Sequence, residues 1–386
     1  MKQSRTDFAL WVNKTKITDI TQHELIHTEL TKGQIRINIQ RFGLSANNVT
    51  YAVTGESFGY WGFFPAVDAQ GHHTEYGIVP LWGFAEVIES AHPDIPIGKR
   101  FFGYLPMASH WVFQADKVSA HGFTDIHAQR ASNSPVYDNY VFCDADPQYN
   151  ASREIWQANF RPLFLTSFAL KQFVASETAD TATTIVITSA SSKTAIGAAL
   201  LLNTLTHIHV VGLTSLENVN FVEALECYDE VLTYDEVADI RYTTPVWVLD
   251  FAGNKGLLQQ LQELLDHLHH TSLFIGVTDI EAQQNKPFGK LKGEVFFAPQ
   301  HIKMLIKTWG HERFMAEYAQ AWQLVAKGIE PHFNVTKFSG AAGLIEQYQR
   351  LLQRNVSPND LESFKLLLPP LGARKWESSI FQCIFE

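Results

Sequence analysis

Residues 183–202, TTIVITSASSKTAIGAALLL, carry the pattern that decides the fold of this chain. Residues 184–188 are mostly β-branched and favour a strand, and an Ala/Leu-rich segment with helical character follows a turn of small residues. A dinucleotide-binding unit begins with such a strand–turn–helix, because the phosphates bind at the helix N-terminus. The turn differs from the usual glycine-rich loop, since it contains serines and Lys193 and keeps only one late glycine, Gly197.

Strands and helical segments alternate around this stretch from about residue 151 onward. The apolar strands include HIHVVGLT, PVWVLDF and SLFIGVT, and LLQQLQELLDHL has helical periodicity. Such alternation predicts an α/β fold with a doubly wound parallel sheet. Residues 1–150 instead favour irregular β-structure, in which QIRINIQ at 34–40 alternates apolar and polar positions.

The composition bounds the class of protein. With 386 residues, 46% hydrophobic and 12% aromatic, the chain is long enough for two domains with substantial cores. A net charge of −10 and a pI of 5.9 argue against nucleic acid or an anionic membrane as the main partner. The three cysteines show no CxxC spacing, so they indicate neither a disulfide framework nor a zinc cluster. Without a signal-peptide core or a membrane-spanning apolar run, we expect a cytoplasmic protein.

The turn also invites two other interpretations. Ser192-Lys193-Thr194 is superficially similar to the end of a P-loop, which would indicate a phosphotransferase. A P-loop requires glycines at the positions held here by Ile187 and Ser192, because the backbone must wrap the phosphates closely, and both glycines are missing. Alternatively, the serines only cap the helix and Lys193 is solvated. The rest of the sheet therefore has to support the dinucleotide interpretation.

The end of the next strand bears on the choice of dinucleotide. An acidic residue there accepts a hydrogen bond from the ribose 2′-hydroxyl of NAD. Here Thr214 and Ser215 occupy the strand end, and Glu217 follows slightly beyond. Uncharged donors suit a 2′-phosphate better than a carboxylate does, so NADP(H) is favoured over NAD(H), although no Arg or Lys follows nearby to pair with that phosphate.

Several segments in order along the chain resemble the medium-chain dehydrogenase/reductase superfamily, in its zinc-free branch of quinone oxidoreductase-like and enoyl reductase-like proteins. The similar segments are GQIRINIQRFGLSANNVTYAVTG (33–55), VPLWGFAEVIES (79–90), IPIGKRFFGYLP (95–106), RPLFLTSFAL (161–170), YDEVLTYDEV (228–237) and LDFAGNKG (249–256). Within the superfamily, the variant loop, VVGLTS and FFAP resemble a bacterial group of unknown function.

This resemblance implies an architecture. It implies a GroES-like β-barrel catalytic domain at 1–152 and a Rossmann doubly wound parallel-sheet domain at 153–312. A C-terminal segment at 313–386 would return to the catalytic domain, the active site would lie between the two domains, and the protein would be a homodimer. It also implies that no metal is bound, since Asn47, Asn48 and Thr50 stand in the segment where zinc-binding members carry ligands.

Without a metal, hydrogen-bond donors must stabilise the charge that develops on a substrate oxygen. Asn48, Tyr51 and Tyr60 lie between residues 40 and 65 and are the catalytic candidates. The resembling enoyl reductases have a tyrosine in this region close to the substrate, which Tyr60 matches best and Tyr51 second. A phenol is a proton donor at pH 7 without any tuning. The alternative is that both tyrosines only pack in the core.

The cofactor-binding residues are expected at the carboxyl ends of the parallel strands. They are Thr166, Ser189, Ala190, Ser191, Ser192, Lys193, Thr194, Gly197, Thr214, Ser215, Asn218, Asp250, Gly253, Gly276 and Thr278. The function expected from them is a zinc-independent NADP(H)-dependent oxidoreductase that reduces an activated C=C bond, a quinone or a carbonyl of a small apolar substrate. The alternative is a degenerate nucleotide-binding protein that has the fold without the turnover.

Overall fold

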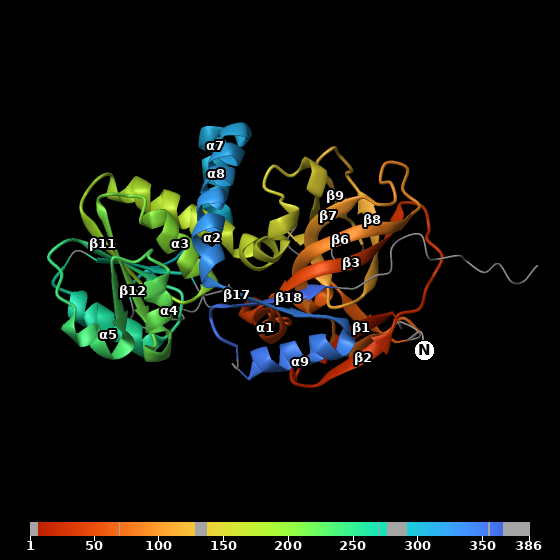
Figure 1. Ribbon diagram of the computed structural model, residues 1–386, viewed down its shortest axis with the longest axis horizontal. Coiled ribbons are helices and arrows are strands. Elements are labelled where there is room, and N and C mark those ends of the chain that lie inside the picture. The colour runs from red at the N-terminus through yellow and green to blue at the C-terminus, as the bar shows by residue number, and fades with distance from the viewer. Residues whose placement is uncertain are drawn as a thin grey trace, which may run out of the picture.

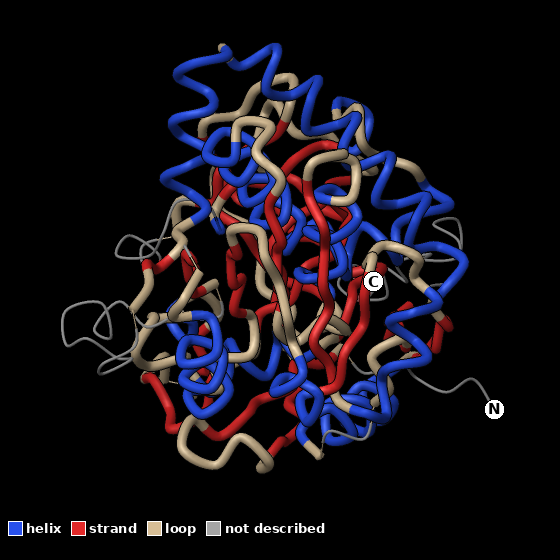
Figure 2. Tube along the Cα trace, turned by 90° about the vertical axis from the view of Figure 1, so that its left-hand side faces the viewer, coloured by secondary structure: helices blue, strands red, loops and turns tan. Residues whose placement is uncertain are grey.

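The computed structural model describes residues 7–68, 70–127, 137–268, 270–275, 292–353 and 356–365. These residues form a β-rich lobe and an α/β lobe, which Figure 1 shows side by side. In the view turned by 90°, strands run through the middle of the molecule and most helices lie toward the outside (Figure 2). Within the described ranges, no helix is both long enough and apolar enough to cross a bilayer.

A closed barrel of six antiparallel strands forms the centre of the β-rich lobe. The strands follow the order β3–β6–β7–β10–β9–β8, and β8 pairs back with β3. Their bounds are β3 Gln34–Leu44, β6 Pro80–Ser90, β7 Arg100–Pro106, β8 His110–Asp116, β9 Gly122–Asp125 and β10 Asn139–Phe142. Register shifts after Arg36 and after Ile39 bend β3. Its first half therefore closes the barrel against β8, while its second half extends beyond the barrel.

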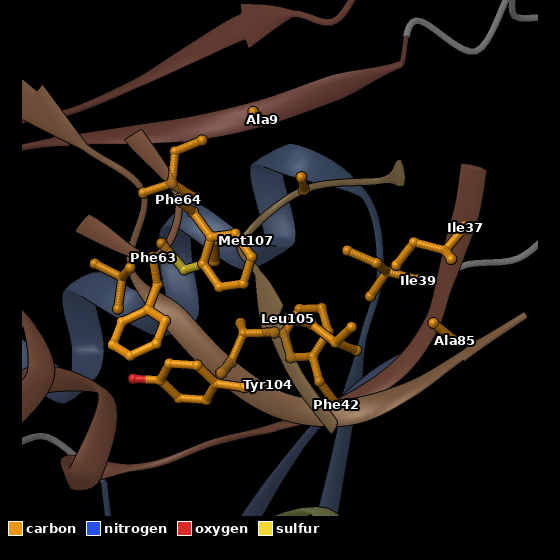
Figure 3. Packing of buried hydrophobic residues seen from close by; sticks show 14 of the residues in the cluster. Ala9, Ile37, Ile39, Phe42, Phe63, Phe64, Ala85, Tyr104, Leu105 and Met107 are labelled. Atoms are coloured by element: carbon orange, nitrogen blue, oxygen red, sulfur yellow. The ribbon is translucent and has the colours of Figure 1, made fainter. Parts of the chain in front are cut away.

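A smaller antiparallel sheet covers one side of the barrel. Its strands are β1 Phe8–Asn13, β2 Ile20–Glu24, β4 Pro65–Val67 and β5 His73–Gly77. Helix α1, Ala46–Val53, follows β3 directly. The shared core is rich in aromatic side chains, and Figure 3 shows Phe63, Phe64 and Tyr104 beside Leu105 and Met107.

The α/β lobe is built on a parallel sheet with the order β13–β12–β11–β14–β15–β16. The bounds are β11 Thr183–Ile187, β12 Ile208–Thr214, β13 Glu230–Thr233, β14 Val246–Asp250, β15 His270–Phe274 and β16 Glu294–Val295. This is the Rossmann order, in which the chain starts in the middle and builds outward first to one side and then to the other. The doubly wound sheet predicted from the strand–helix alternation is confirmed.

Helices cover both faces of this sheet because its central strand is apolar on both sides. Ile185 and Ile187 of β11 pack into a cluster with α2 (Glu154–Thr178) and α3 (Lys193–Leu202). Val186 packs into a second cluster with α5 (Lys255–Leu265). The short α4, Val219–Ala224, follows β12.

The chain returns to the barrel near its C-terminus. After α7 (Ala298–Trp309) and α8 (His311–Ile329) come β17 (Asn334–Phe338), α9 (Gly340–Leu352) and β18 (Asp360–Lys365). β18 pairs antiparallel with the second half of β3, so that Glu362 lies opposite Leu44. Figure 1 shows β17, β18 and α9 next to α1, below the barrel.

A buried carboxylate joins α2 to the barrel. Glu154, the first residue of α2, accepts hydrogen bonds from Arg100 at 2.7 Å and from the Tyr149 hydroxyl at 2.9 Å. Arg41 of β3 adds an ion pair at 3.4 Å. Because both arginines compensate a carboxylate that is shielded from water, this contact holds the start of the Rossmann lobe against the barrel.

Candidate dinucleotide site

The loop between β11 and α3 adopts a glycine-like conformation without a glycine. Ser189 has a φ of +53°, in the left-handed region that side chains disfavour. This turn directs the next residue across the neighbouring strand, where the Ala190 N–H donates to the Leu213 carbonyl at 3.0 Å. A side chain at Gly212 would meet the Ala190 Cβ at 3.0 Å, so Gly212 lets the loop lie directly on β12. Backbone contacts therefore hold the loop in this conformation, which a glycine would adopt more easily.

Two tyrosines around β13 brace the same loop. The Tyr228 hydroxyl donates to the Ala190 carbonyl at 2.8 Å, and burial raises the Tyr228 pKa well above its ordinary value. The hydroxyl of Tyr234 is hydrogen-bonded to the backbone of Ser189, and burial raises its pKa as well. Both phenols are therefore neutral at physiological pH. The sequence analysis missed both residues, and the one available signal was a tyrosine on either side of a short strand next to β12.

Two hydroxyl groups near the loop have no hydrogen-bond partner among the described residues. They are Ser192 Oγ and Thr214 Oγ1, and both atoms are buried. Ser192 is the N-cap residue of α3, yet its side chain makes no capping hydrogen bond. Thr214, at the end of β12, is only 1% exposed. It lies on the same face of the sheet as Gly212, because side chains alternate along a strand, and that is the face the loop crosses.

Unpartnered donors at this point could bind an anion. The first-turn N–H groups of α3 have no acceptor within the helix, and the helix dipole adds a partial positive charge. A buried hydroxyl without a partner costs about 1–3 kcal/mol. Ser192 and Thr214 therefore fit a group that supplies acceptors, as phosphate oxygens do.

Asn218 brings two of the predicted cofactor residues together. Its Nδ2 donates to Ser215 Oγ at 2.9 Å and to Ser191 Oγ at 3.4 Å. The amide thereby links the loop after β11 to the turn after β12.

On the opposite side, α2 approaches α3 closely. A Cβ at Gly197 would lie 2.8 Å from Ser167 Oγ, and this hydroxyl donates to the Thr194 carbonyl at 2.8 Å. Thr166, the predicted residue on α2, is adjacent to Ser167 and half-buried.

Lys193 extends from the first position of α3 toward the returning C-terminal segment. Its Nζ lies 6.0 Å from the centre of the Phe333 ring. Burial lowers the Lys193 pKa to about 8, against the opposing effect of the carboxylates of Asp360 and Glu362.

Asp250 ties the ends of β11 and β14 together. Its Oδ1 accepts from the Thr188 hydroxyl at 2.6 Å, and its Oδ2 accepts from the Gly253 N–H at 3.1 Å. The side chain is 0% exposed, and burial raises its pKa. Gly253 has a φ of +65°, which this tight turn requires. The other two predicted residues, Gly276 and Thr278, lie outside the described residues.

The three catalytic candidates occupy the barrel side and differ in what their polar atoms do. Asn48 Oδ1 accepts from the Ser45 N–H at 2.8 Å, and its Nδ2 donates to the Pro80 carbonyl at 2.9 Å. Because it is buried and has partners at both ends of its amide, Asn48 fixes the start of α1 against β6.

Tyr51 and Tyr60 lie together, with ring centres 4.6 Å apart. The Tyr51 hydroxyl accepts from Asn47 Nδ2 at 2.8 Å and from Trp82 Nε1 at 3.0 Å. The Tyr60 hydroxyl lies 3.3 Å from that of Tyr137. Burial raises the pKa of all three tyrosines. The rings of Phe63 and Tyr104 belong to the same aromatic group, with centres 5.2 Å apart. Figure 3 shows these two rings next to each other.

The described residues do not form a metal site. Among the described residues, no group of three or more His, Cys, Asp or Glu side chains could hold an ion. His72 lies on the surface and pairs with Asp68 at 3.3 Å.

The chain is similar to one family and to several solved structures. Residues 42–357 match the profile of a family described as "Protein of unknown function (DUF2855)". No match is found among the curated proteins. CurA from Vibrio vulnificus in complex with NADPH superimposes with a TM-score of 0.59 at 11% identity, covering 94% of this chain and 100% of that chain.

Two further structures superimpose over similar lengths. The Etr1p complex with NADP and crotonyl-CoA has a TM-score of 0.55 at 13% identity and covers 93% of this chain and 99% of that one. The quinone oxidoreductase from Coxiella burnetii has a TM-score of 0.53 at 14% identity and covers 94% and 100%. The chain shares its fold with these structures, a GroES-like barrel with a Rossmann lobe, and this is the architecture that the resemblance implied.

Proposed function

The chain belongs to the DUF2855 family, whose profile spans most of its length, and we propose that it is an NADP(H)-dependent oxidoreductase. One observation carries the proposal. The buried hydroxyls of Ser192 and Thr214 have no partner among the described residues, and they lie at the carboxyl end of a parallel sheet beside the first turn of α3. The NADPH and NADP complexes of superimposable proteins support the same assignment.

The pyrophosphate would bind at the loop through Ser191, Ser192 and the first-turn N–H groups of Lys193 and Thr194, with the Lys193 ammonium nearby. Ser189 and Ala190 shape the loop, since their own N–H groups already have partners in Tyr234 and Leu213.

At the adenosine side, Thr214, Ser215 and Asn218 present uncharged donors, which suit a 2′-phosphate. We assign Asp250 and Gly253 to the turn that supports the loop, and Thr166 to the α2 side of the cofactor.

The cofactor would supply a hydride, and the residues of the chain would bind the substrate and deliver a proton. We propose that the Tyr60 hydroxyl is the proton donor, with Tyr137 as its hydrogen-bond partner at 3.3 Å. Burial keeps these phenols neutral, and hence able to donate. Tyr51 would orient the site through its two accepted hydrogen bonds, and Asn48 would hold α1 in place.

A cluster of aromatic side chains with a few hydroxyl groups suits a small apolar enone, quinone or carbonyl compound. We further propose zinc independence, the three-part division at 152 and 312, a homodimer and a cytoplasmic location, as expected from the sequence.

A second candidate function is supported by the same loop. Because the N–H groups of Ser189 and Ala190 donate to protein acceptors, the loop offers a phosphate fewer donors than a glycine loop does. A nucleotide-binding protein without turnover would tolerate that loss.

Calorimetric titration with NADPH, NADH and Mg-ATP, followed by turnover assays with enones, quinones and aldehydes, separates the candidates. We expect NADPH to bind more tightly than NADH and to be oxidised by at least one acceptor class. Binding of Mg-ATP alone would refute dinucleotide binding, and tight NADPH binding without oxidation by any class would establish the non-catalytic alternative.

A further inference from the structure

A buried ion pair on α2 has no part in the proposed function. Arg161 and Asp146 form it, and their side chains are 13% and 3% exposed. Asp146 Oδ2 accepts from Arg161 Nη1, and no other described residue accepts from the guanidinium, so its remaining N–H groups lack acceptors within the described ranges. Desolvation makes a buried ion pair costly, and apolar residues in its place are often at least as stable. A role other than stability is therefore expected for this pair.

Arg161 lies on the part of α2 that runs between the two lobes. The helix starts at the barrel, where Glu154 is held, and farther along the Ser167 hydroxyl donates to the Thr194 carbonyl in the first turn of α3. Arg161 lies between these two contacts, and its guanidinium carbon is 5.0 Å from the centre of the Phe102 ring of β7. The cation therefore faces the barrel at its junction with the Rossmann lobe.

A row of aromatic rings connects Arg161 with the proposed proton donor. The Phe102 ring stacks on Trp82 of β6, with centres 5.7 Å apart. Trp82 Nε1 donates to the Tyr51 hydroxyl at 3.0 Å, and the Tyr51 ring centre lies 4.6 Å from that of Tyr60. One end of the row thus carries a cation, and the other carries the phenol proposed to protonate the substrate. Aromatic rings suit an apolar ligand body, and a guanidinium suits an anionic group.

Two buried glutamines beside the ion pair also lack partners. Both ends of the Gln148 side-chain amide and Gln157 Oε1 have no hydrogen-bond partner among the described residues, although the two residues are only 2% and 0% exposed. The Gln148 N–H donates to Asp146 Oδ1 at 3.0 Å, and Gln157 Nε2 donates to the Gln148 carbonyl at 2.5 Å. Gln157 precedes Arg161 by one helical turn, on the same face of α2. Buried amides are nearly always hydrogen-bonded, so unpartnered ones are expected where a ligand supplies the missing partners.

We propose that Arg161 determines substrate specificity by binding a carboxylate of the substrate. The acceptor is then an apolar compound that carries one anionic group remote from the bond that is reduced. This inference rests on the proposed function and narrows its substrate class. A guanidinium can hold a carboxylate through two parallel hydrogen bonds, and Asp146 leaves N–H groups available for them. Because its other oxygen accepts from the Gln148 N–H, Asp146 meets Arg161 with one oxygen only and fixes the direction of the guanidinium.

Two ligands that differ only in a carboxylate test the proposal by calorimetry. They are benzylacetone and para-carboxybenzylacetone, titrated into the protein with and without NADP⁺, so that no hydride is available and binding alone is measured. In the wild type the carboxylated ligand should bind about tenfold or more tightly than the neutral one, because hydrogen bonds to a charged group are strong. Arg161→Gln should abolish this preference.

Two further variants separate a lost contact from a lost fold. Arg161→Gln leaves Asp146 buried without its cation, so the double variant Arg161→Gln/Asp146→Asn replaces the ion pair by two neutral amides and should also lose the preference. The matched control is Arg153→Gln, which removes a cation that pairs with Glu330 at 3.0 Å near the start of α2, and it should keep the wild-type preference. Equal Kd values for the two ligands in the wild type, or a preference that persists in the folded double variant, would overturn the proposal.

Turnover links the carboxylate to the reaction. With NADPH, Arg161→Gln should lower kcat/KM for para-carboxybenzalacetone about tenfold more than for benzalacetone, mainly through KM, because the lost contact lies far from the reduced bond. An equal decrease for the two enones would overturn the role of Arg161 in specificity. If the wild type neither binds NADPH nor reduces either enone, the proposed function fails, and the titrations without NADP⁺ still decide whether Arg161 binds a carboxylate.

Discussion

Replacing Thr214 by valine should make the protein more stable and its cofactor affinity weaker. Thr214 Oγ1 is buried without a hydrogen-bond partner among the described residues, in a side chain that is 1% exposed. Valine has nearly the same shape and a high strand propensity, so the swap removes only the unpartnered hydroxyl. An unsatisfied buried hydroxyl costs about 1–3 kcal/mol, and we expect a gain of about 1 kcal/mol in unfolding free energy, or about 3 °C in Tm.

The same change should weaken NADPH binding, because the proposed site uses this hydroxyl as a donor to phosphate. A hydrogen bond to a charged group contributes about 1.5–3 kcal/mol, so the Kd should rise about tenfold or more. Thermal unfolding of the apo protein and calorimetric titration of NADPH measure the two effects on one sample. A gain in stability together with a loss of NADPH affinity would indicate that this hydroxyl serves to bind a ligand.

Thr178→Val is the matched control. Thr178 is also buried, but its hydroxyl donates to the Val174 carbonyl at 2.9 Å and lies 3.0 Å from His207 Nε2. The control should lose about 1 kcal/mol of stability and leave NADPH affinity unchanged. An unaltered NADPH Kd in folded Thr214→Val protein would refute the assignment of this hydroxyl to the cofactor.

Three further substitutions test the loop, its helix and the barrel. Ser189→Gly should stabilise the protein by up to about 1 kcal/mol, because it relieves the φ of +53°. The control, Ser191→Gly, should destabilise the protein by about 0.5–1 kcal/mol. Equal effects of the two substitutions in thermal unfolding would exclude strain at Ser189. Gly197→Ala places a Cβ 2.8 Å from Ser167 Oγ and should destabilise the protein by about 1–3 kcal/mol. Adding Ser167→Ala should recover part of the lost stability, and no recovery would mean that the strain lies elsewhere. Tyr60→Phe should lower kcat about 100-fold with little change in KM, measured by NADPH oxidation, and a wild-type kcat would leave Tyr60 a packing residue.

Much of the fold was predictable because its signals are local. Strand β11 is buried on both faces, and this appears in the sequence as an unbroken β-branched run. The Rossmann order follows from strand–helix alternation together with the connection rules of parallel sheets. The barrel was expected from the family resemblance alone, because its closure depends on β3 pairing with β8, far along the chain.

The sequence predicted where the candidate site lies, but it predicted only some of the contacts within the site. Asn218, Ser191 and Ser215 were expected near the cofactor, and the structure joins them by hydrogen bonds. Their roles as cofactor ligands stay predictions. Asp250 was expected among the cofactor-binding residues, and its oxygens accept from Thr188 and from the backbone of the following turn, so its place at the cofactor also stays a prediction. Strand ends identify which residues meet at a sheet edge, but not which of them satisfy one another.

By itself the sequence determined the alternation of elements, the place of the loop after β11 and the polar character of the β12 end. Each of these features depends on residues that are close together in the sequence, through side-chain periodicity and backbone propensity. Only the tertiary structure decided that Tyr228 and Tyr234 brace the loop, and that Lys193 lies over the Phe333 ring. Those contacts join residues from separate strands and helices, and so they depend on how the layers pack, which no local pattern records.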